Sequence, residues 1–382
     1  MYDVPHLRFP EFSGEWEKYR LCDVASIVGR IGFRGYTTND IVTKGKGAIA
    51  LSPTNIENNK LTYDKDNTYI SFYKYEESPE IMIKQGDVIF VKTGSTVGKV
   101  AYVDKLICKT TLNPQVVVLK DIQCDNYLLS VLMSTNKFQN AIRKIIVGGA
   151  VPTLSQAAMG DIVVTMPQAT EQEKLSKFIS LLDDRIATQN KIIEDLKILK
   201  SAIAERLFNS TDGDILSLSD VCIIQKGKQV NGEDLSETGK FYVMNGGVEP
   251  SGYYDQCNTP ANTISISEGG NSCGYIQYNR DAFWSGGHCY TLNNIQPNVC
   301  KLYLYHYLKS QESSIMKLRI GTGLPNIQKK DLEKFHILLT SKAIQESISA
   351  FLTTIDRKIT NEDMLLQRFQ KGKQYLLRQM FI

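Results

Sequence analysis

The chain has 382 residues, of which 42% are apolar and 22% charged, as is usual for a globular protein of two or three domains. No run approaches the ~18 consecutive apolar residues of a membrane helix, and the opening "MYDVPHLRFPEF" lacks the basic region and apolar block of a signal peptide. Eight cysteines without a Cys-x-x-Cys pair favour reduced thiols. We therefore expect a cytoplasmic protein with no membrane partner.

The formal net charge of +3 is distributed unevenly along the chain. Residues 1–150 carry +3, residues 151–210 carry −1, residues 211–325 carry −3 and residues 326–382 carry +4. No segment has the strong basic excess that is typical of a protein binding nucleic acid on its own. The charge therefore argues against an unaided DNA-binding protein.

The first globular region contains the glycine-rich stretch "VKTGSTVGKVAYV" at 91–103. A phosphate-binding loop of the Walker type needs four residues between its glycines and Ser or Thr after the lysine. Here Gly94 and Gly98 are separated by three residues, and valine follows the lysine. Because β-rich runs flank the glycines, the stretch predicts a strand–turn–strand unit instead.

The second half of the chain repeats the first. "VGGAVPTL" at 147–154 and "IGTGLPNI" at 320–327 align at an offset of 173, which continues without a gap to the end of the chain. The glycine turn also returns, because Gly270 and Gly274 of "SEGGNSCGYIQY" align with the two glycines of the first turn at an offset of 176. The sequence therefore predicts an internal duplication.

Each copy ends in a long helical segment with a heptad seam, in which apolar residues alternate at spacings of four and three. The seam of the first helix is Leu175, Ile179, Leu182, Ile186, Ile193, Leu196, Ile203 and Leu207. The seam of the second helix is Ile348, Leu352, Ile355, Ile359, Leu366, Phe369, Leu376 and Met380. The predicted boundaries are 1–165 for the first globular domain, 166–210 for the first helix, 211–338 for the second globular domain and 339–382 for the second helix.

The predicted fold class is α+β, with two homologous globular α/β domains joined by two long helices and related by a pseudo-twofold axis. Only the short link "NSTDGD" separates the first helix from the second domain, so the second helix must run back along the first. An antiparallel coiled coil follows, with each helix roughly 55 Å long. Its register predicts that Lys200 lies near Asp356 and Lys373 near Asp183.

Motifs for catalysis are missing from the sequence. An adenine methyltransferase would need an Asn-Pro-Pro-Tyr type motif, and the nearest string, "NPQV" at 113–116, lacks the second proline and the aromatic residue. No Gly-x-Gly-x-x-Gly follows a predicted strand, and the pair His288-Cys289 is better explained by packing than by zinc binding. We therefore expect no catalytic residue, no metal ligand and no cofactor bound by this chain.

Side chains that can read base edges are dense around the predicted turns. Two domains with one frame and different surfaces suit the recognition of two different short sequences. The candidates in the first domain are Arg30, Arg34, Lys44, Lys46, Lys92, Thr93, Ser95 and Thr96. The candidates in the second domain are Lys226, Lys228, Gln229, Asn245, Glu268, Asn271 and Ser272.

Over essentially its full length, the chain resembles the specificity subunits of type I restriction–modification systems. The resemblance rests on "PHLRFPEFSGEWE", "TGSTVGKVAYV", "VPTLS" before "EQEKLSKFISLLDDRI", "YVMNGGVEPSGYYD", "SEGGNSCG", "SGGHCYTL" and "LLRQMF". It implies two target-recognition domains that each read one half of a split site in double-stranded DNA. It also implies two helices that act as a spacer, no catalysis by the subunit itself, and a bacterial or archaeal cytoplasm.

The resemblance further implies two modification subunits, which carry S-adenosylmethionine and methylate adenine, and restriction subunits, which use ATP and magnesium. Partners that share the DNA phosphates would explain the weak basic charge of this chain. Two alternatives remain: a free-standing duplicated DNA-binding protein, such as a repressor, and a coiled-coil adaptor that binds only proteins.

Overall fold

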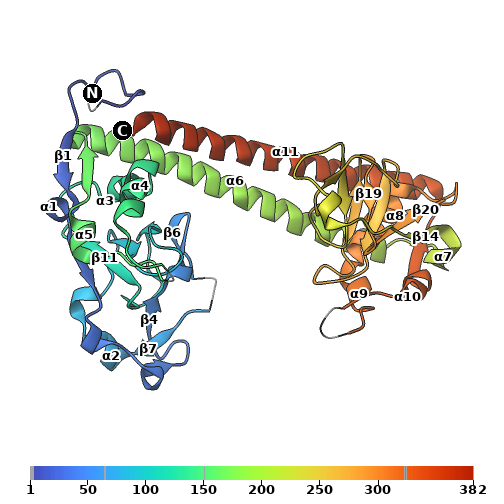
Figure 1. Cartoon of the computed structure of the whole chain (residues 1–382). Helices are drawn as coiled ribbons and strands as arrows, with labels where there is room; N and C mark the ends of the chain where they lie inside the picture. The colour runs from blue at the N-terminus through green and yellow to red at the C-terminus, as the bar shows by residue number, and fades with distance from the viewer. Residues whose placement is uncertain (1–3, 64–65, 150, 322, 324, 382) are drawn as a thin grey trace. The chain divides into compact units, whose positions relative to one another are not determined.

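The computed structural model describes residues 4–63, 66–149, 151–321, 323 and 325–381. The chain forms two compact units: unit 1 contains the residues up to Thr188 and those from Gln367 onward, and unit 2 contains Gln189–Leu366. Each unit holds one globular domain and parts of two long helices (Figure 1). The predicted α+β class is confirmed. None of the helices formed by the described residues is both long and apolar enough to span a bilayer.

The domain of unit 1 is built on two mixed sheets. The strands of the first sheet, in order, are β2 (Ser26–Gly29), β11 (Val116–Lys120), β8 (Val88–Val91), β9 (Val100–Tyr102), β6 (Asn59–Leu61) and β5 (Ile56–Glu57). Those of the second are β10 (Thr110–Leu112), β4 (Gly47–Leu51), β7 (Tyr69–Ser71) and β3 (Ile41–Val42). A further pair joins β1 (Glu17–Arg20) to β12 (Val163–Met166). The helices include α1 (Leu21–Val24), α2 (Phe72–Glu76), α3 (Asn126–Met133), α4 (Asn136–Ile145) and α5 (Gln156–Gly160).

Both faces of the central strands β8 and β11 are buried, so their side chains alternate between two cores. On one face Val88, Phe90 and Val117 pack with side chains of α3 and α4. On the other face Ile89 and Val118 pack with side chains of β4 and β10. This double burial fixes the ends of β8 and β11, from which the candidate site residues emerge.

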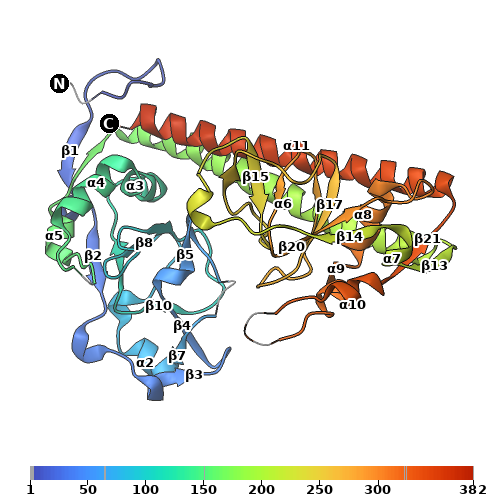
Figure 2. The same cartoon turned by 45° about the vertical axis from the view of Figure 1, so that its right-hand side comes forward.

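The domain of unit 2 repeats the central part of this arrangement. Its main sheet has the order β14 (Ile223–Lys226), β20 (Cys289–Asn293), β17 (Thr263–Ser267) and β18 (Ile276–Asn279). Smaller sheets are formed by β16 (Tyr253–Tyr254), β15 (Phe241–Met244) and β19 (Trp284–Ser285), and by β13 (Asp214–Ser217) and β21 (His336–Leu339). The helices include α7 (Leu218–Val221), α8 (Lys301–Ser310), α9 (Glu312–Met316) and α10 (Lys329–Glu333). Helix α8 packs on the main sheet (Figure 2), where Leu304 and Leu308 share a core with Ile264 and Ile266.

The two glycine turns close antiparallel hairpins, which confirms the strand–turn–strand prediction. One turn joins β8 to β9, and the other joins β17 to β18. All four turn glycines, Gly94, Gly98, Gly270 and Gly274, have positive φ angles between 75° and 106°. L-residues rarely adopt this conformation, so the glycine spacing reflects backbone geometry rather than phosphate binding.

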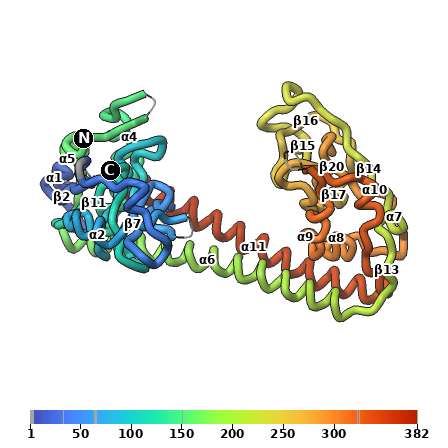
Figure 3. Tube along the Cα trace, turned by 90° about the horizontal axis from the view of Figure 1, so that it is seen from below, coloured from blue at the N-terminus to red at the C-terminus, as the bar shows by residue number. Residues whose placement is uncertain are grey.

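The long helices are α6 (Ala169–Asn209), with 41 residues, and α11 (Lys342–Met380), with 39 residues. Each is about 60 Å long. In unit 1 Lys373 Nζ pairs with Asp183 Oδ1, and in unit 2 Lys200 Nζ lies 2.5 Å from Asp356 Oδ1. Both predicted ion pairs are thus confirmed. The helix segments run antiparallel side by side within each unit (Figures 1 and 3), and all the seam residues are buried or half-buried.

A repeated glutamine attaches each domain to its own long helix. In unit 1 the backbone N–H of Asp125, at the start of α3, donates to Gln172 Oε1 at 2.9 Å, while Gln172 Nε2 donates to a backbone carbonyl at 2.8 Å. In unit 2 the N–H of Cys300, at the start of α8, donates to Gln345 Oε1 at 2.7 Å, while Gln345 Nε2 donates to Thr340 O at 2.7 Å. The glutamines therefore satisfy backbone groups that a helix start leaves without an intrahelical partner.

Candidate DNA interface

The loop after β8 is held by backbone hydrogen bonds to two distant segments. The N–H of Lys92 donates to Gln115 O at 2.9 Å, and the N–H of Leu154 donates to Lys92 O at 2.8 Å. Thr93 forms an isolated bridge with Thr153. Lys92 therefore occupies a fixed backbone position between the segment before β11 and the "VPTLS" segment.

The loop after β17 has the same backbone frame. The N–H of Glu268 donates to His288 O at 2.9 Å, and the N–H of Ile327 donates to Glu268 O at 2.9 Å. Since these bonds repeat those of the first domain, Glu268 corresponds to Lys92 and His288 corresponds to Gln115. The two domains therefore place opposite charges at one structural position.

A pocket of about 550 Å³ brings together five of the seven candidates of the second domain. They are Lys226, Asn245, Glu268, Asn271 and Ser272. The pocket, called here the Glu268 pocket, is also lined by His288, which was not among the predicted candidates. His288 could be assigned to the pocket only from the pairing of β17 with β20. This pairing sets Ser267 opposite Cys289 and thereby brings His288 beside Glu268.

Glu268 is the most constrained side chain of this pocket, with 10% of it exposed. Lys226 Nζ donates to Oε1 at 2.6 Å, and the hydroxyl of Tyr290 donates to the same atom at 3.0 Å. Burial and this carboxylate raise the pKa of Tyr290, so its hydroxyl remains a donor. Oε2 is buried and has no hydrogen-bond partner among the described residues, since His288 Nδ1 lies 3.6 Å away.

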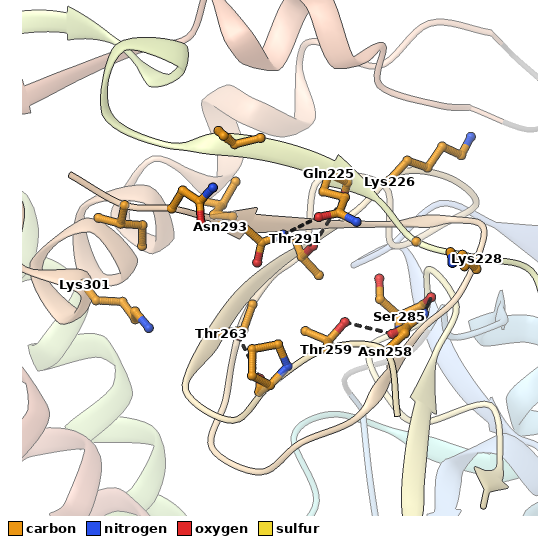
Figure 4. Close-up of a pocket in the computed structure, with 16 residues that line it drawn as sticks. Gln225, Lys226, Lys228, Asn258, Thr259, Thr263, Ser285, Thr291, Asn293 and Lys301 are labelled. Carbon is orange, nitrogen blue, oxygen red and sulfur yellow. Dashed lines mark hydrogen bonds between the residues drawn. The ribbon is translucent and has the colours of Figure 1, made fainter. Parts of the chain in front are cut away.

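The candidates Lys228 and Gln229 follow β14. Lys228 lines a second pocket of about 590 Å³, called here the Lys228 pocket, together with Lys226 and Lys301 (Figure 4). Asn293 Nδ2 donates to Gln225 Oε1 at 3.0 Å in this pocket. Cationic and amide side chains of this kind suit DNA phosphates and base edges. Gln229 is exposed, and its Nε2 donates to the carbonyl of Val230 at 3.2 Å.

The candidates Ser95 and Thr96 of the first domain line a pocket of about 560 Å³ beside the β8–β9 turn. Asn58 and Asn59, which were not predicted, line it too, and both have positive φ angles, of 49° and 61°. Lys99 is another lining residue. Lys92 and Thr93 are half-buried on the loop after β8.

Arg30 requires a correction, because the structure uses it as a structural residue and not as a base reader. It is 6% exposed. Its Nε donates to Leu112 O at 2.8 Å, its Nη2 donates to Thr111 Oγ1 at 3.1 Å, and its Nη1 donates to Arg34 O at 3.1 Å. The guanidinium thus links β2 to β10 and is committed within the fold.

The remaining candidates lie on other parts of the first domain. Arg34 is half-buried, with Nη1 3.5 Å from Glu80 Oε1. Lys44 and Lys46 are exposed in the turn that joins β3 to β4, and neither is among the described residues that line the pockets above. None of these three residues lines a pocket described above.

Comparison with known proteins identifies the family of the chain. The family model described as the type I restriction modification DNA specificity domain matches residues 13–197 and 212–368. A protein named as a type I specificity subunit in Mycoplasma genitalium is 35% identical over 160 residues, which is 41% of this chain and 42% of that relative. One named as a MjaX specificity subunit of a type I restriction enzyme, from Methanocaldococcus jannaschii, is 22% identical over an alignment covering 96% of this chain and 93% of the relative.

Solved structures show the same fold. The crystal structure of a type I restriction–modification S subunit from M. genitalium matches with a TM-score of 0.64 and 18% identity over 99% of both chains. A chain from a structural study of complex assembly in a type I system matches with a TM-score of 0.56 and 17% identity, over 96% of this chain and 97% of that one. With the family model matching both halves of the sequence, the chain belongs to the family of type I restriction–modification DNA specificity proteins.

Proposed function

We propose that this chain recognises a split target in double-stranded DNA, with each domain reading one half, as the non-catalytic specificity subunit of a type I restriction–modification complex. The observation that carries the proposal is the repeated backbone frame with unlike side chains, Lys92 in one domain and Glu268 in the other. A shared frame presents both loops to DNA in the same way, while unlike polar groups select unlike bases.

The helices join the two domains and also supply a surface for the modification subunits. Large apolar side chains stand exposed on them in both units: Leu181 and Tyr375 are 59% and 62% exposed in unit 1, and Ile198 and Phe351 are 61% and 51% exposed in unit 2. Exposed side chains of this size on a helix pair support a protein-binding role.

The proposal assigns S-adenosylmethionine to two modification subunits, and ATP with magnesium to restriction subunits, in a bacterial or archaeal cytoplasm. One feature supports this assignment. The stretch of this chain that is similar to a phosphate loop is a glycine turn that closes a β-hairpin.

The test is methylation-sensitive whole-genome sequencing of a methylation-null host that expresses this chain with its modification subunits. A matched culture lacks only this chain. We expect N6-methyladenine at one split motif, and only when the chain is present. Methylation that does not depend on the chain, or none from an intact and soluble assembly, would contradict the proposal and favour an adaptor that binds only proteins.

The free-standing alternative predicts a different result in solution. A repressor-like protein would bind its site equally well with and without partners. We expect the chain alone to bind weakly because residues 211–325 carry a net charge of −3, and the assembly to bind tightly with a steep salt dependence. Fluorescence anisotropy at two salt concentrations separates the two cases.

A further inference from the structure

The Glu268 pocket contains a buried acceptor that the protein itself does not satisfy. Glu268 Oε1 accepts from Lys226 and Tyr290, whereas Oε2 has no donor within hydrogen-bonding distance in the described part of the chain. A buried carboxylate oxygen without a partner is destabilising. A ligand that brings a donor into the pocket would remove this penalty.

The ring of His288 stands beside this oxygen without filling the role of donor. Its Nδ1 lies 3.6 Å from Oε2, and its side chain is 62% exposed. An exposed ring can change rotamer without disturbing the core. His288 can therefore give way when another group approaches Oε2.

Glycines leave the walls of the pocket open to a flat ligand. Gly246, Gly247, Gly269 and Gly270 all line it, and a Cβ on Gly270 would meet no other atom within 4 Å. Glycine at such places allows a ligand to approach the backbone closely. The cavity, at about 550 Å³, is of the size that accommodates small planar groups.

A carboxylate can only accept hydrogen bonds. In the major groove, the hydrogen-bond donors of the bases are the exocyclic amino groups, N4 of cytosine and N6 of adenine. Building on the proposed function, we propose that Glu268 Oε2 is a specificity determinant that accepts a hydrogen bond from the exocyclic amino group of one base in the half-site read by the second domain.

The first domain places the opposite chemistry at the same position. Lys92 has three donor hydrogens and no acceptor, so it selects acceptors, such as O6 and N7 of guanine. The residue at this point of the repeated frame therefore sets whether a domain reads a base amino group or a base carbonyl.

The test uses the assembled complex of the full chain and its modification subunits, with duplexes that carry the motif found by sequencing. Cytosine is replaced by 2-pyrimidinone, or adenine by purine, one position at a time, so that only the amino group is lost. We expect binding by the wild-type complex to weaken by about tenfold to a hundredfold at one position of one half-site. Which analogue does so distinguishes cytosine from adenine.

The variant Glu268→Gln assigns the effect to this residue. Lys226 and Tyr290 are donors, so they keep the amide oxygen of the substituted side chain at the place of Oε1 and put its NH₂ group at the place of Oε2. The Glu268→Gln complex should therefore bind the amino-less duplex at least as tightly as the natural one. The control Glu237→Gln changes an exposed carboxylate outside the pocket and should behave as the wild type does.

Two results would overturn the inference while leaving the proposed function intact. In one, the wild-type complex binds its split motif, but no amino group in either half-site contributes. In the other, Glu268→Gln and the wild type show the same loss on the amino-less duplex. If the wild-type complex shows no preference for any motif, both proposals fail together.

Discussion

The two domains share a backbone frame but differ at four positions around one pocket. In the second domain Lys226, Glu268, His288 and Tyr290 form a polar cluster whose centre is a carboxylate. Backbone pairing places different residues at the corresponding positions of the first domain, and these are Gly29, Lys92, Gln115 and Val117. The backbone bonds are the same in both domains, so hydrogen bonds between main-chain groups determine the frame. The chemistry at these positions depends on a few side chains, which can differ between the domains while the frame stays the same.

The ion pairs of the long helices also have different surroundings in the two units. Asp183 pairs with Lys373 in unit 1, and Asp356 pairs with Lys200 in unit 2. The group beside the other carboxylate oxygen differs between the two units. In unit 1 the hydroxyl of Tyr127 donates to Asp183 Oδ2 at 2.6 Å. In unit 2 the ring of a buried histidine, His306, lies 3.9 Å from Asp356 Oδ2 instead. The duplicated helices thus share the lysine–aspartate pair, while each domain places a different side chain beside the aspartate.

The largest effect is expected when the charge of one domain is copied into the other. Glu268→Lys places a second ammonium group beside that of Lys226, and the two repel each other. It also presents hydrogen-bond donors to a base amino group, which is itself a donor. We expect methylation at the wild-type motif to fall by about a hundredfold, measured as the methylated fraction of motif copies by sequencing.

The matched control for these charge changes is Lys105→Met, at an exposed position of the first domain outside the pockets. It removes one charge from a residue that is not a candidate for DNA binding, so methylation should be unchanged. Lys92→Met should instead relax recognition in the other half-site. A loss of the same half-site in Lys92→Met and Glu268→Lys would contradict the assignment of one half-site to each domain.

The turn glycines provide the next largest effect. Alanine is strained at both Gly98 and Gly274, where φ is 98° and 92°. At Gly274 its Cβ would also lie 3.0 Å from Met316 Cα, whereas at Gly98 it would meet the flexible end of Gln139. We expect Gly274→Ala to lower the free energy of unfolding of unit 2 by about 3 kcal/mol, and Gly98→Ala that of unit 1 by about 1–2 kcal/mol.

The two tryptophans allow each unit to be followed separately, because Trp16 lies in unit 1 and Trp284 in unit 2. Denaturant unfolding is measured by fluorescence in Trp16→Phe and Trp284→Phe backgrounds. Equal losses for the two alanine variants would show that backbone strain, rather than the neighbour, determines the penalty.

Acid is expected to destabilise unit 2 more than unit 1. Burial, together with the charge of Lys200, lowers the pKa of His306 to about 4, although Asp356 opposes the shift. The unfolded chain takes up a proton near pH 6.5, whereas the folded histidine stays neutral to about pH 4. Stability is therefore lost as pH falls through this window, by about 2 kcal/mol between pH 7.5 and pH 5.

The variant His306→Gln should remove this part of the pH dependence. It is measured by Trp284 fluorescence in the Trp16→Phe background, and unit 1, in which Tyr127 takes the corresponding place beside the aspartate, provides the internal comparison. An unchanged slope for unit 2 in His306→Gln would rule out this histidine as its source.

The smallest single effect is expected for one of the helix ion pairs, that of Lys373 with Asp183. Lys200→Met leaves Asp356 without its cation, and His306 is too distant for a hydrogen bond. Lys373→Met leaves Asp183 with the hydroxyl of Tyr127. We expect losses of about 2 and about 1 kcal/mol, respectively. Chemical unfolding of each unit is the measurement, and adding Tyr127→Phe to Lys373→Met should bring the two losses close together.

The sequence predicted those features that depend on periodicity and repetition. The offset of 173 residues was sufficient for the duplication, and together with the heptad register it predicted both ion pairs. The α+β class also needed the β-rich runs around the glycine turns. The positive φ angles at Gly94 and Gly270 explain why the glycine turns kept their spacing while the residues between them changed.

Features that depend on contacts between distant segments could not be predicted. Arg30 is buried because β10 supplies acceptors 81 and 82 residues further along the chain. His288 and Tyr290 reach Glu268 through the pairing of β17 with β20. Composition around a turn indicates where polar groups gather, but not which of them the fold already uses.

The paired glutamines have a mechanical consequence. The Oε1 atoms of Gln172 and Gln345 accept from backbone N–H groups of the attached domain, while the Nε2 atoms donate to the segment that leads into the helix. A tilt of either domain on its helix must break the bond to Oε1, so each domain and its own end of the helix pair move as one body. A displacement of the domain when its loops bind a ligand is then transmitted to the long helix attached to it.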